Sequence, residues 1–265
     1  MKMRDVKEKN RRIFDSCTHA YLGRELFRPE QRFLQLLRGR WADADVLDLG
    51  VGAGRTAYTF SAIARSYVGV DFSPRMIEMS RATIGESDRV KFILGDCCDL
   101  SFLNGRQFDV VIFSFNGIDC VGHDDRLSIL AEIKKLVRAE TGCFFFSSHN
   151  LHMYPFPLTL PPFRVSRALR SLYHVSRASA QHVLLKFLNR HVNTTVAFRR
   201  GWEILRDGAH SVELRLCYIT PECQVAQLKE LGFEVITIYD LEGNSIDPAK
   251  PPKDWWFHYL CRLKD

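Results

Sequence analysis

Acids and glycines recur at defined spacings over residues 46–96, where they could hold a ligand that carries a ribose. The stretch 46–54 reads VLDLGVGAG, in which Asp48 precedes three glycines at alternating positions. These are Gly50, Gly52 and Gly54. Glycines let a backbone turn tightly and approach a ligand closely, because no Cβ stands in the way. Asp71 ends the next apolar run, 21 residues after Gly50, and a carboxylate at such a strand tip can accept hydrogen bonds from both hydroxyls of a ribose.

The glycine spacing separates two kinds of nucleotide ligand. A dinucleotide-binding loop has the pattern G-x-G-x-x-G, and its helix N-terminus faces a pyrophosphate. This chain has G-x-G-x-G instead, with Asp48 two residues before the first glycine. A carboxylate at that place repels a pyrophosphate and attracts a cationic amino group. An NAD-dependent oxidoreductase is therefore disfavoured.

Four segments in chain order resemble the motifs of the class I S-adenosylmethionine-dependent methyltransferases of small-molecule type. They are DLGVGAG (48–54), GVDFSPRMI (69–77), GD (95–96) and VVIFSFNGID (110–119). The resemblance covers about residues 40–150. It implies an α/β fold with a Rossmann-like class I methyltransferase sheet, mostly parallel with an antiparallel edge strand. It also implies S-adenosyl-L-methionine as the cofactor.

The resemblance assigns cofactor contacts to individual residues. Asp48 and the three glycines would hold the methionine end of the cofactor, Asp71 its ribose and Asp96 its adenine amino group. Further candidate contacts to the cofactor are Tyr21, Met76, Cys97 and Ser114. Two of these assignments have structural alternatives, because Met76 could pack in the core and Asp96 could be a simple turn residue.

Polar residues near the ends of two later predicted strands are the candidates for catalysis and substrate binding. Ligands of open α/β sheets bind beyond the carboxyl ends of the strands. His149 follows the predicted strand 143–147 and could take a proton from a hydroxyl or an amine, or it could bond only backbone groups. Asn116 and Asn150 have similar placements, and Asp119 could either contact the substrate or cap a turn.

Alternating strand and helix patterns position these residues and predict a parallel sheet with right-handed crossovers. The rhythm breaks near residue 150, where four prolines exclude regular structure, and it resumes at Pro221. Between them, residues 202–220 predict a β-hairpin that turns near Asp207. We therefore expect residues 1–150 and 221–265 to form one cofactor-binding domain, and residues 151–220 to form an inserted substrate lid with a basic helix and the hairpin.

The inserted segment has an unusual charge distribution. Residues 141–202 contain eight arginines and lysines and no acid, whereas the whole chain has a net charge of +6. Arg167 and Arg170 belong to a run of basic residues at helical spacing. Three interpretations stay open: a solvated helix face, a wall that recruits an anionic substrate, or a basic amphipathic helix in peripheral contact with an anionic membrane.

Composition limits the remaining possibilities. The hydrophobic content of 46% indicates a packed globular protein. The charged start MKMRDVKEKNRR has no apolar signal region, so we expect a cytoplasmic protein. The eight cysteines contain no C-x-x-C pair and are expected to be reduced. Cysteines and histidines are not clustered at ligand spacing, and we expect no metal site.

We therefore predict a methyltransferase that acts on an O or N atom of a small molecule or glycan-type metabolite, anionic if the basic segment meets it. Residues 114–117 read SFNG and lack the [D/N/S]-P-P-[Y/F/W] motif of enzymes that methylate nucleobase amino groups. We accordingly expect no nucleic acid partner. Two alternatives stay open: an RNA methyltransferase that binds phosphates with the basic lid, and a non-catalytic S-adenosylmethionine-binding protein.

Overall fold

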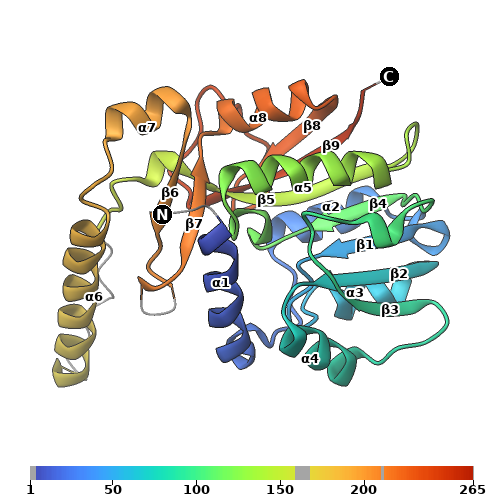
Figure 1. Ribbon diagram of the computed structural model, residues 1–265, viewed down its shortest axis with the longest axis horizontal. Helices are drawn as coiled ribbons and strands as arrows, with labels where there is room; N and C mark the ends of the chain where they lie inside the picture. Colours follow the sequence, from blue (N-terminus) through green and yellow to red (C-terminus); the bar gives the residue numbers. More distant parts are fainter. Residues whose placement is uncertain (1–3, 159–167, 210–211, 265) are drawn as a thin grey trace.

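A single twisted sheet with helices on both faces forms the body of the protein in the computed structural model, which describes residues 4–158, 168–209 and 212–264 (Figure 1). Five parallel strands follow the order β3-β2-β1-β4-β5. Their bounds are β1 Asp45–Leu49, β2 Ser66–Asp71, β3 Val90–Leu94, β4 Val110–Phe113 and β5 Cys143–Asn150. The predicted α/β class and parallel core are confirmed.

Two apolar cores lie on opposite faces of this sheet. On one face, α5 (His123–Leu136) and α8 (Pro221–Glu230) pack against residues such as Leu47. On the other face, helices pack against residues such as Val46. These helices are α2 Arg28–Leu36, α3 Ala57–Ile63 and α4 Pro74–Ile84. Alternate residues of each strand therefore serve opposite cores, and this requires the nearly continuous apolar runs seen in the sequence.

The antiparallel strands occur where the resemblance implied them. Strand β9 (Trp256–Leu263) runs antiparallel between β5 and β8 (Phe233–Tyr239). The antiparallel strand thus lies one place inside the edge, and β8 forms the edge itself.

Strand β5 is longer than predicted and includes His149 and Asn150. We expected it to end near residue 147, with both residues in the following loop. Instead, residues Phe144–His149 pair with β9, and residues 149–150 pair with β7 (Arg215–Ile219). These ladder hydrogen bonds extend the strand. Because β9 occupies one edge of β5, strands β4 and β7 must follow one another along the other edge.

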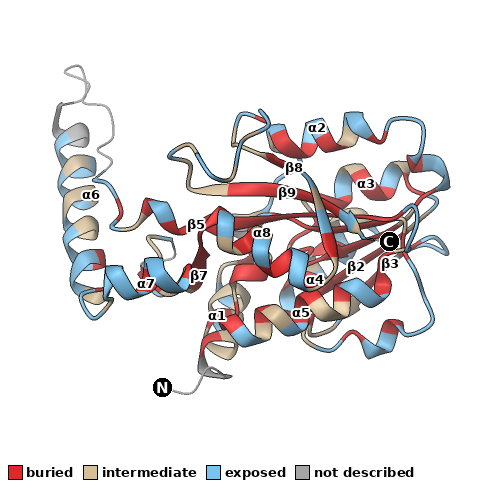
Figure 2. Ribbon diagram, turned by 90° about the horizontal axis from the view of Figure 1, so that it is seen from above, coloured by how far each residue is buried: buried red, intermediate tan, exposed pale blue. Residues whose placement is uncertain are grey.

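The predicted hairpin is present between β6 (Trp202–Arg206) and β7, which pair antiparallel. With α6 (Ala168–Leu188) and α7 (Thr194–Arg200), it belongs to the segment between β5 and α8. Figures 1 and 2 show α6 standing at one end of the molecule, away from the main sheet. A third apolar cluster joins Leu185 of α6 to Leu205 and Leu216 of the hairpin. The division into domain and lid stays a prediction.

The remaining helices are short or lie at the N-terminus. They are α1 Arg4–Ser16, η1 Thr18–Tyr21, η2 Trp41–Asp43, η3 Ser101–Leu103, η4 Gly117–Asp119 and η5 Leu151–Met153. Within residues 4–158, 168–209 and 212–264, no helix is both long and apolar enough to cross a membrane.

Candidate active site

A cavity of about 660 Å³ lies at the carboxyl ends of the parallel strands and extends to α1, α6 and the hairpin. Most of the residues predicted for the site line it. They are Tyr21, Asp48, Gly50, Gly52, Asp71, Met76, Asp96, Cys97, Ser114, Asn116 and His149. Gly54, Asp119 and Asn150 are absent from its wall. Arg167 lies outside the described residues, and Arg170 lies in α6, where its side chain is not described.

The three glycines of the loop after β1 have different surroundings. All have positive φ, which favours glycine. A Cβ on Gly50 would lie 2.7 Å from the Phe113 ring, and one on Gly54 would lie 3.2 Å from Ile84. A Cβ on Gly52 would meet only the Gly50 carbonyl oxygen, at 4.0 Å. Gly52 therefore keeps backbone open to the cavity, whereas Gly54 allows close packing against α4.

Asp71 is held in a fixed orientation at the tip of β2. Its Oδ2 accepts from the Gly52 backbone N–H at 2.9 Å, and its Oδ1 accepts from the Ser73 N–H at 2.9 Å. Burial raises the pKa of this carboxyl to about 6, against the lowering effect of those two N–H groups. Each carboxylate oxygen keeps acceptor capacity for a hydroxyl group of a ligand.

Asp48 is a buried carboxylate beneath the same loop. Its Oδ2 accepts from the Thr56 hydroxyl and the Tyr67 hydroxyl, both at 2.6 Å. Burial raises the pKa of Asp48 to about 6, although these two hydroxyls lower it. At neutral pH its negative charge therefore faces a cavity that could hold a cationic amino group.

Asp96 contacts Lys7 of α1, a residue that was not among the predicted site residues. Lys7 Nζ binds Asp96 Oδ2, and the Cys98 N–H donates to Asp96 Oδ1 at 3.0 Å. Burial tends to raise the pKa of Asp96, but the hydrogen bonds from Lys7 and the Cys98 N–H, together with the positive charge of Lys7, outweigh burial, and the pKa is lowered. This contact joins α1 to the loop after β3, near the place predicted for the adenine.

Ser114 is joined to a buried ion pair that was also not predicted. Its hydroxyl donates to Glu30, and Arg55 contacts both carboxylate oxygens of Glu30 at 2.6 Å. Arg55 follows the glycine loop, and its guanidinium lies 4.3 Å from the centre of the Phe27 ring. Despite burial, Arg55 keeps the pKa of Glu30 below its ordinary value. This cluster fixes one wall of the cavity.

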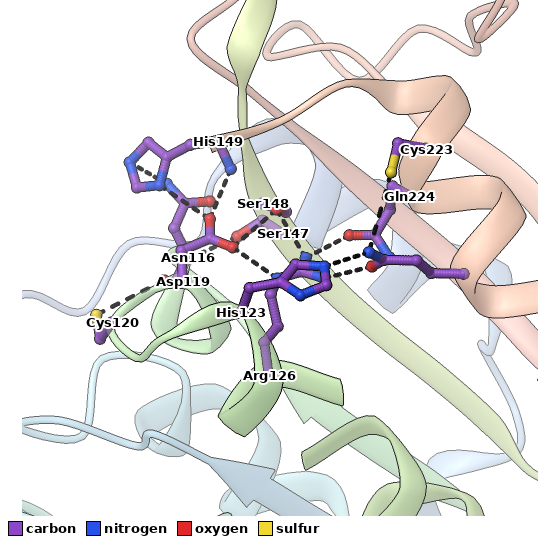
Figure 3. A network of polar contacts seen from close by, with 11 residues as sticks. Asn116, Asp119, Cys120, His123, Arg126, Ser147, Ser148, His149, Cys223 and Gln224 are labelled. Carbon is purple, nitrogen blue, oxygen red and sulfur yellow. Dashed lines mark hydrogen bonds and ion pairs between the residues drawn. The ribbon is translucent and has the colours of Figure 1, made fainter. Parts of the chain in front are cut away.

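His149 belongs to a buried polar network beside the cavity (Figure 3). Its Nδ1 lies 2.9 Å from Asp119 Oδ2, which also accepts from the His149 backbone N–H at 2.7 Å. The other oxygen of Asp119 accepts from Ser148 Oγ at 2.8 Å and from Arg126 Nε at 3.2 Å. A carboxylate facing Nδ1 favours the tautomer with the proton on that atom, so that Nε2 carries the lone pair.

Asn116 lies on the cavity side of His149. It has φ +61, and its Nδ2 lies 3.3 Å from His149 Nε2. Two buried polar atoms nearby have no hydrogen-bond partner within the described ranges: Asn116 Oδ1 and Trp256 Nε1. Both residues line the cavity. A ligand could satisfy both atoms by donating a hydrogen bond to Asn116 Oδ1 and accepting one from Trp256 Nε1.

Two residues predicted to bind substrate lie behind the wall. Asp119 is fully buried, and its carboxylate accepts hydrogen bonds from His149, Ser148 and Arg126. Asn150 donates to the Asp254 carbonyl oxygen at 3.0 Å and accepts from the His152 N–H at 3.0 Å, which caps η5. The polar groups of Asp119 and Asn150 therefore already have hydrogen-bond partners within the protein. Asp119 orients His149, and Asn150 caps η5.

The part of the wall supplied by the inserted segment is mainly apolar. Its apolar members are Phe156, Pro157, Leu158, Ala178, Leu185, Ala209, Leu214, Leu216 and Tyr218. The acid Asp207 also lines it and accepts from the Tyr218 hydroxyl at 2.6 Å. The described arginine and lysine side chains of this segment do not line the cavity: Arg206 and Arg215 of the hairpin are half-buried, and five others are exposed. The exposed five are Arg177, Lys186, Arg190, Arg199 and Arg200.

Metal chemistry has no visible ligand set in the described part of the chain. No group of three or more His, Cys, Asp or Glu side chains there could hold a metal ion.

The part of the sequence that contains the motifs is similar to known methyltransferases. Residues 46–140 match the family described as "Methyltransferase domain". The chain is 33% identical over 99 residues to a demethylmenaquinone methyltransferase of Clavibacter sepedonicus, a match that covers 36% of this chain and 40% of that protein. It is 29% identical over 143 residues to a ubiquinone/menaquinone biosynthesis C-methyltransferase of Citrifermentans bemidjiense, covering 49% of this chain and 59% of the relative.

A solved structure has a similar fold. The 1,6-didemethyltoxoflavin-N1-methyltransferase of Burkholderia thailandensis, solved with bound 1,6-didemethyltoxoflavin and S-adenosylhomocysteine, superposes with a TM-score of 0.62 at 17% identity. The superposition covers 100% of this chain and 92% of the other. The matched segments span about half the length of the two curated relatives, whereas the superposition with this solved structure covers nearly all of both chains.

Proposed function

We propose that this chain, which carries a class I S-adenosylmethionine-dependent methyltransferase domain over residues 46–140, transfers a methyl group to a nucleophilic atom of a small, mainly apolar molecule. The observation that carries the proposal is the position of His149. Its ring lines the same cavity as Gly52 and Asp71, and its Nδ1 is held by the buried Asp119.

The residues around the glycine loop fit S-adenosyl-L-methionine. Gly52 leaves space that a Cβ would enter, Asp71 presents an oriented carboxylate for ribose hydroxyls, and Asp48 presents negative charge for the amino group. When bound, this cofactor supplies a methyl group on a sulfonium. The side chains of Met76 and Cys97 give the cavity a partly apolar wall for the adenine ring.

In this proposal His149 accepts the proton that the methyl acceptor loses. Because Asp119 favours the Nδ1–H tautomer, Nε2 is the basic atom. Asn116 Nδ2 lies 3.3 Å from Nε2 and would hold the ring until the acceptor enters. Much of the rate enhancement would come from alignment of the reacting atoms in the cavity, and the base would add about 10²–10⁴-fold.

The wall of the cavity favours an apolar or aromatic acceptor over an anionic or glycan-type one. Ring and aliphatic side chains dominate the half formed by the inserted segment, and Asp207 is its charged member among the described residues. An anion placed there would be repelled by Asp207 and would meet no arginine or lysine among the described side chains of α6 and the hairpin. An RNA substrate is disfavoured for the same reason.

Methyl transfer to carbon is a second candidate. Two relatives have names that describe quinone-pathway methyltransferases, one of them a C-methyltransferase. A base at His149 would serve this reaction too, because an aromatic carbon becomes nucleophilic when a ring hydroxyl loses its proton. The product identifies the atom that receives the methyl group.

Transfer of isotope-labelled methyl from S-adenosylmethionine to a panel of extracted metabolites tests the proposal. We expect label in a product that partitions into organic solvent, with methylation of O, N or C read from its mass spectrum. Label in RNA would favour the RNA methyltransferase. Tight binding of S-adenosylhomocysteine with no labelled product from any fraction would favour the non-catalytic binding protein.

A further inference from the structure

Helix α6 has an exposed apolar face that the proposed reaction does not use. Five large apolar side chains of this helix lie at the surface: Leu172, Tyr173, Val183, Leu184 and Phe187, which are 43–66% exposed. At about 100° per residue, they occupy the side opposite to Ala178, His182 and Leu185, which line the cavity. The helix is therefore apolar on two sides, one turned to the cavity and one to solvent.

The charged side chains that flank the outer face are all positive among those described. Arg177, Lys186 and Arg190 of this region are exposed, and the sequences of α6 and α7 contain no acid. The guanidinium of Arg190 lies 3.9 Å from the centre of the Phe187 ring, so that cation and apolar surface are contiguous.

We infer that the outer face of α6 docks on an anionic lipid membrane, lying along its surface. Soluble monomers rarely expose a contiguous apolar face of this kind unless it binds something. A helix with a wide apolar face, basic flanks and no acids matches segments that insert shallowly at the headgroup boundary. Lysine and arginine stems reach from such a face to lipid phosphates. A second copy of this face would oppose cations to cations, which disfavours self-association.

The position of α6 suits this role. It stands at one end of the molecule, clear of the main sheet (Figures 1 and 2). Its inner side packs through Leu185 against the hairpin, so the outer side can contact lipid without displacing the packed core. The inference does not depend on the methyl transfer.

Sedimentation with vesicles tests the inference on the full chain. We expect the protein to sediment with phosphatidylcholine vesicles that contain phosphatidylserine, to bind pure phosphatidylcholine at least tenfold less, and to dissociate partly in high salt. The double variant Val183→Asp, Phe187→Asp should bind anionic vesicles at least tenfold more weakly. Ile236→Asp is the matched control, because Ile236 is 52% exposed but lies on β8, and it should bind as the wild type does.

Three results would overturn the inference. They are no binding of the wild type to anionic vesicles, equal binding of the wild type and the double variant, and equal loss in the Ile236→Asp control. Light scattering tests whether a second copy of the chain occupies the face instead. If the wild type is a dimer that binds no vesicles, and the double variant is a monomer, the face belongs to a dimer interface. Melting temperature and affinity for S-adenosylhomocysteine should match the wild type in all variants, which separates loss of docking from misfolding.

Discussion

His149 Nδ1 lies 2.9 Å from Asp119 Oδ2. The two residues are 30 positions apart in the sequence, and the pairing of β4 with β5 brings them together. Asp119 lies in η4 after β4, and His149 lies in β5. The carboxylate is completely buried and is also bound by Arg126, so that it cannot turn away from the imidazole. A histidine held in this way has one ring nitrogen committed to the protein and one directed to a reacting group.

Replacing His149 by Gln should therefore lower turnover about 10²-fold or more, because the base is lost while a polar side chain of similar reach remains. Affinity for S-adenosylhomocysteine, measured by calorimetry, should change little. His152→Gln is the control, since His152 is absent from the cavity wall and should keep full activity. Full activity of the His149 variant would remove this residue from the mechanism.

Local sequence patterns predicted the parts of the site that depend on a single strand and its turn. The glycine loop follows β1 and Asp71 ends β2, as the pattern predicted. Helix α4 begins directly after Ser73, whose Oγ accepts from the Met76 N–H at 3.2 Å. Each of these depends on neighbours within a few residues. A residue's type and spacing were sufficient because the turn itself dictates them.

Contacts between distant segments could not be predicted in this way. Lys7 reaches Asp96 across 89 positions, and Arg55 reaches Glu30 across 25. Charged residues at such separations have many possible partners in the sequence, and only the packed sheet selects one. The buried role of Asp119 was missed for the same reason, because nothing in residues 110–119 shows that Arg126 and His149 will enclose it.

Gly52→Ala should weaken binding of S-adenosylhomocysteine at least tenfold, because the new methyl group would enter the cavity at a backbone position with φ +58. The strain of a left-handed residue should also cost about 1–2 kcal/mol of stability. Gly105→Ala is a matched control, with φ +80, open space around a new Cβ and no place on the cavity wall. Equal affinity in the two variants would show that the cofactor does not approach Gly52.

Affinity for S-adenosylhomocysteine should depend on pH through Asp71. Ribose hydroxyls donate to a carboxylate, and burial raises the pKa of Asp71 to about 6. Binding should therefore weaken as pH falls through about 6. In Asp71→Asn the binding free energy at pH 7.5 should be less favourable by roughly 1.5–3 kcal/mol, and the affinity should vary less with pH near pH 6. Calorimetric titration from pH 5 to 8 measures both, and a variant that binds as tightly as the wild type would misplace the ribose.

Asp48 should destabilise the ligand-free protein at neutral pH. Its pKa is raised from 3.8 to about 6 by burial, so the folded state holds its proton more tightly than the unfolded state. Stability should consequently fall as pH rises from about 4 to 6, and the ionised carboxylate is a net cost above that range. A shift of about two units corresponds to about 3 kcal/mol at most. Asp48→Asn keeps an acceptor for Thr56 and Tyr67 and should be more stable than the wild type at pH 7.5, with little difference at pH 4.

Asp45 provides a control of opposite sign on the same strand. A hydrogen bond from Arg65 lowers the pKa of Asp45, so its ionised form is favoured by folding. Asp45→Asn should therefore reduce the free energy of unfolding at pH 7.5, and the difference should vanish as pH falls through the lowered pKa. Urea unfolding of both variants and the wild type at pH 4 and 7.5 distinguishes the two acids: the effect of Asp48→Asn should largely disappear at pH 4, whereas that of Asp45→Asn should persist there, because pH 4 lies above the lowered pKa of Asp45. If Asp48→Asn is no more stable than the wild type at pH 7.5, the hydroxyls of Thr56 and Tyr67 offset the burial of that charge, and the acid costs the fold nothing.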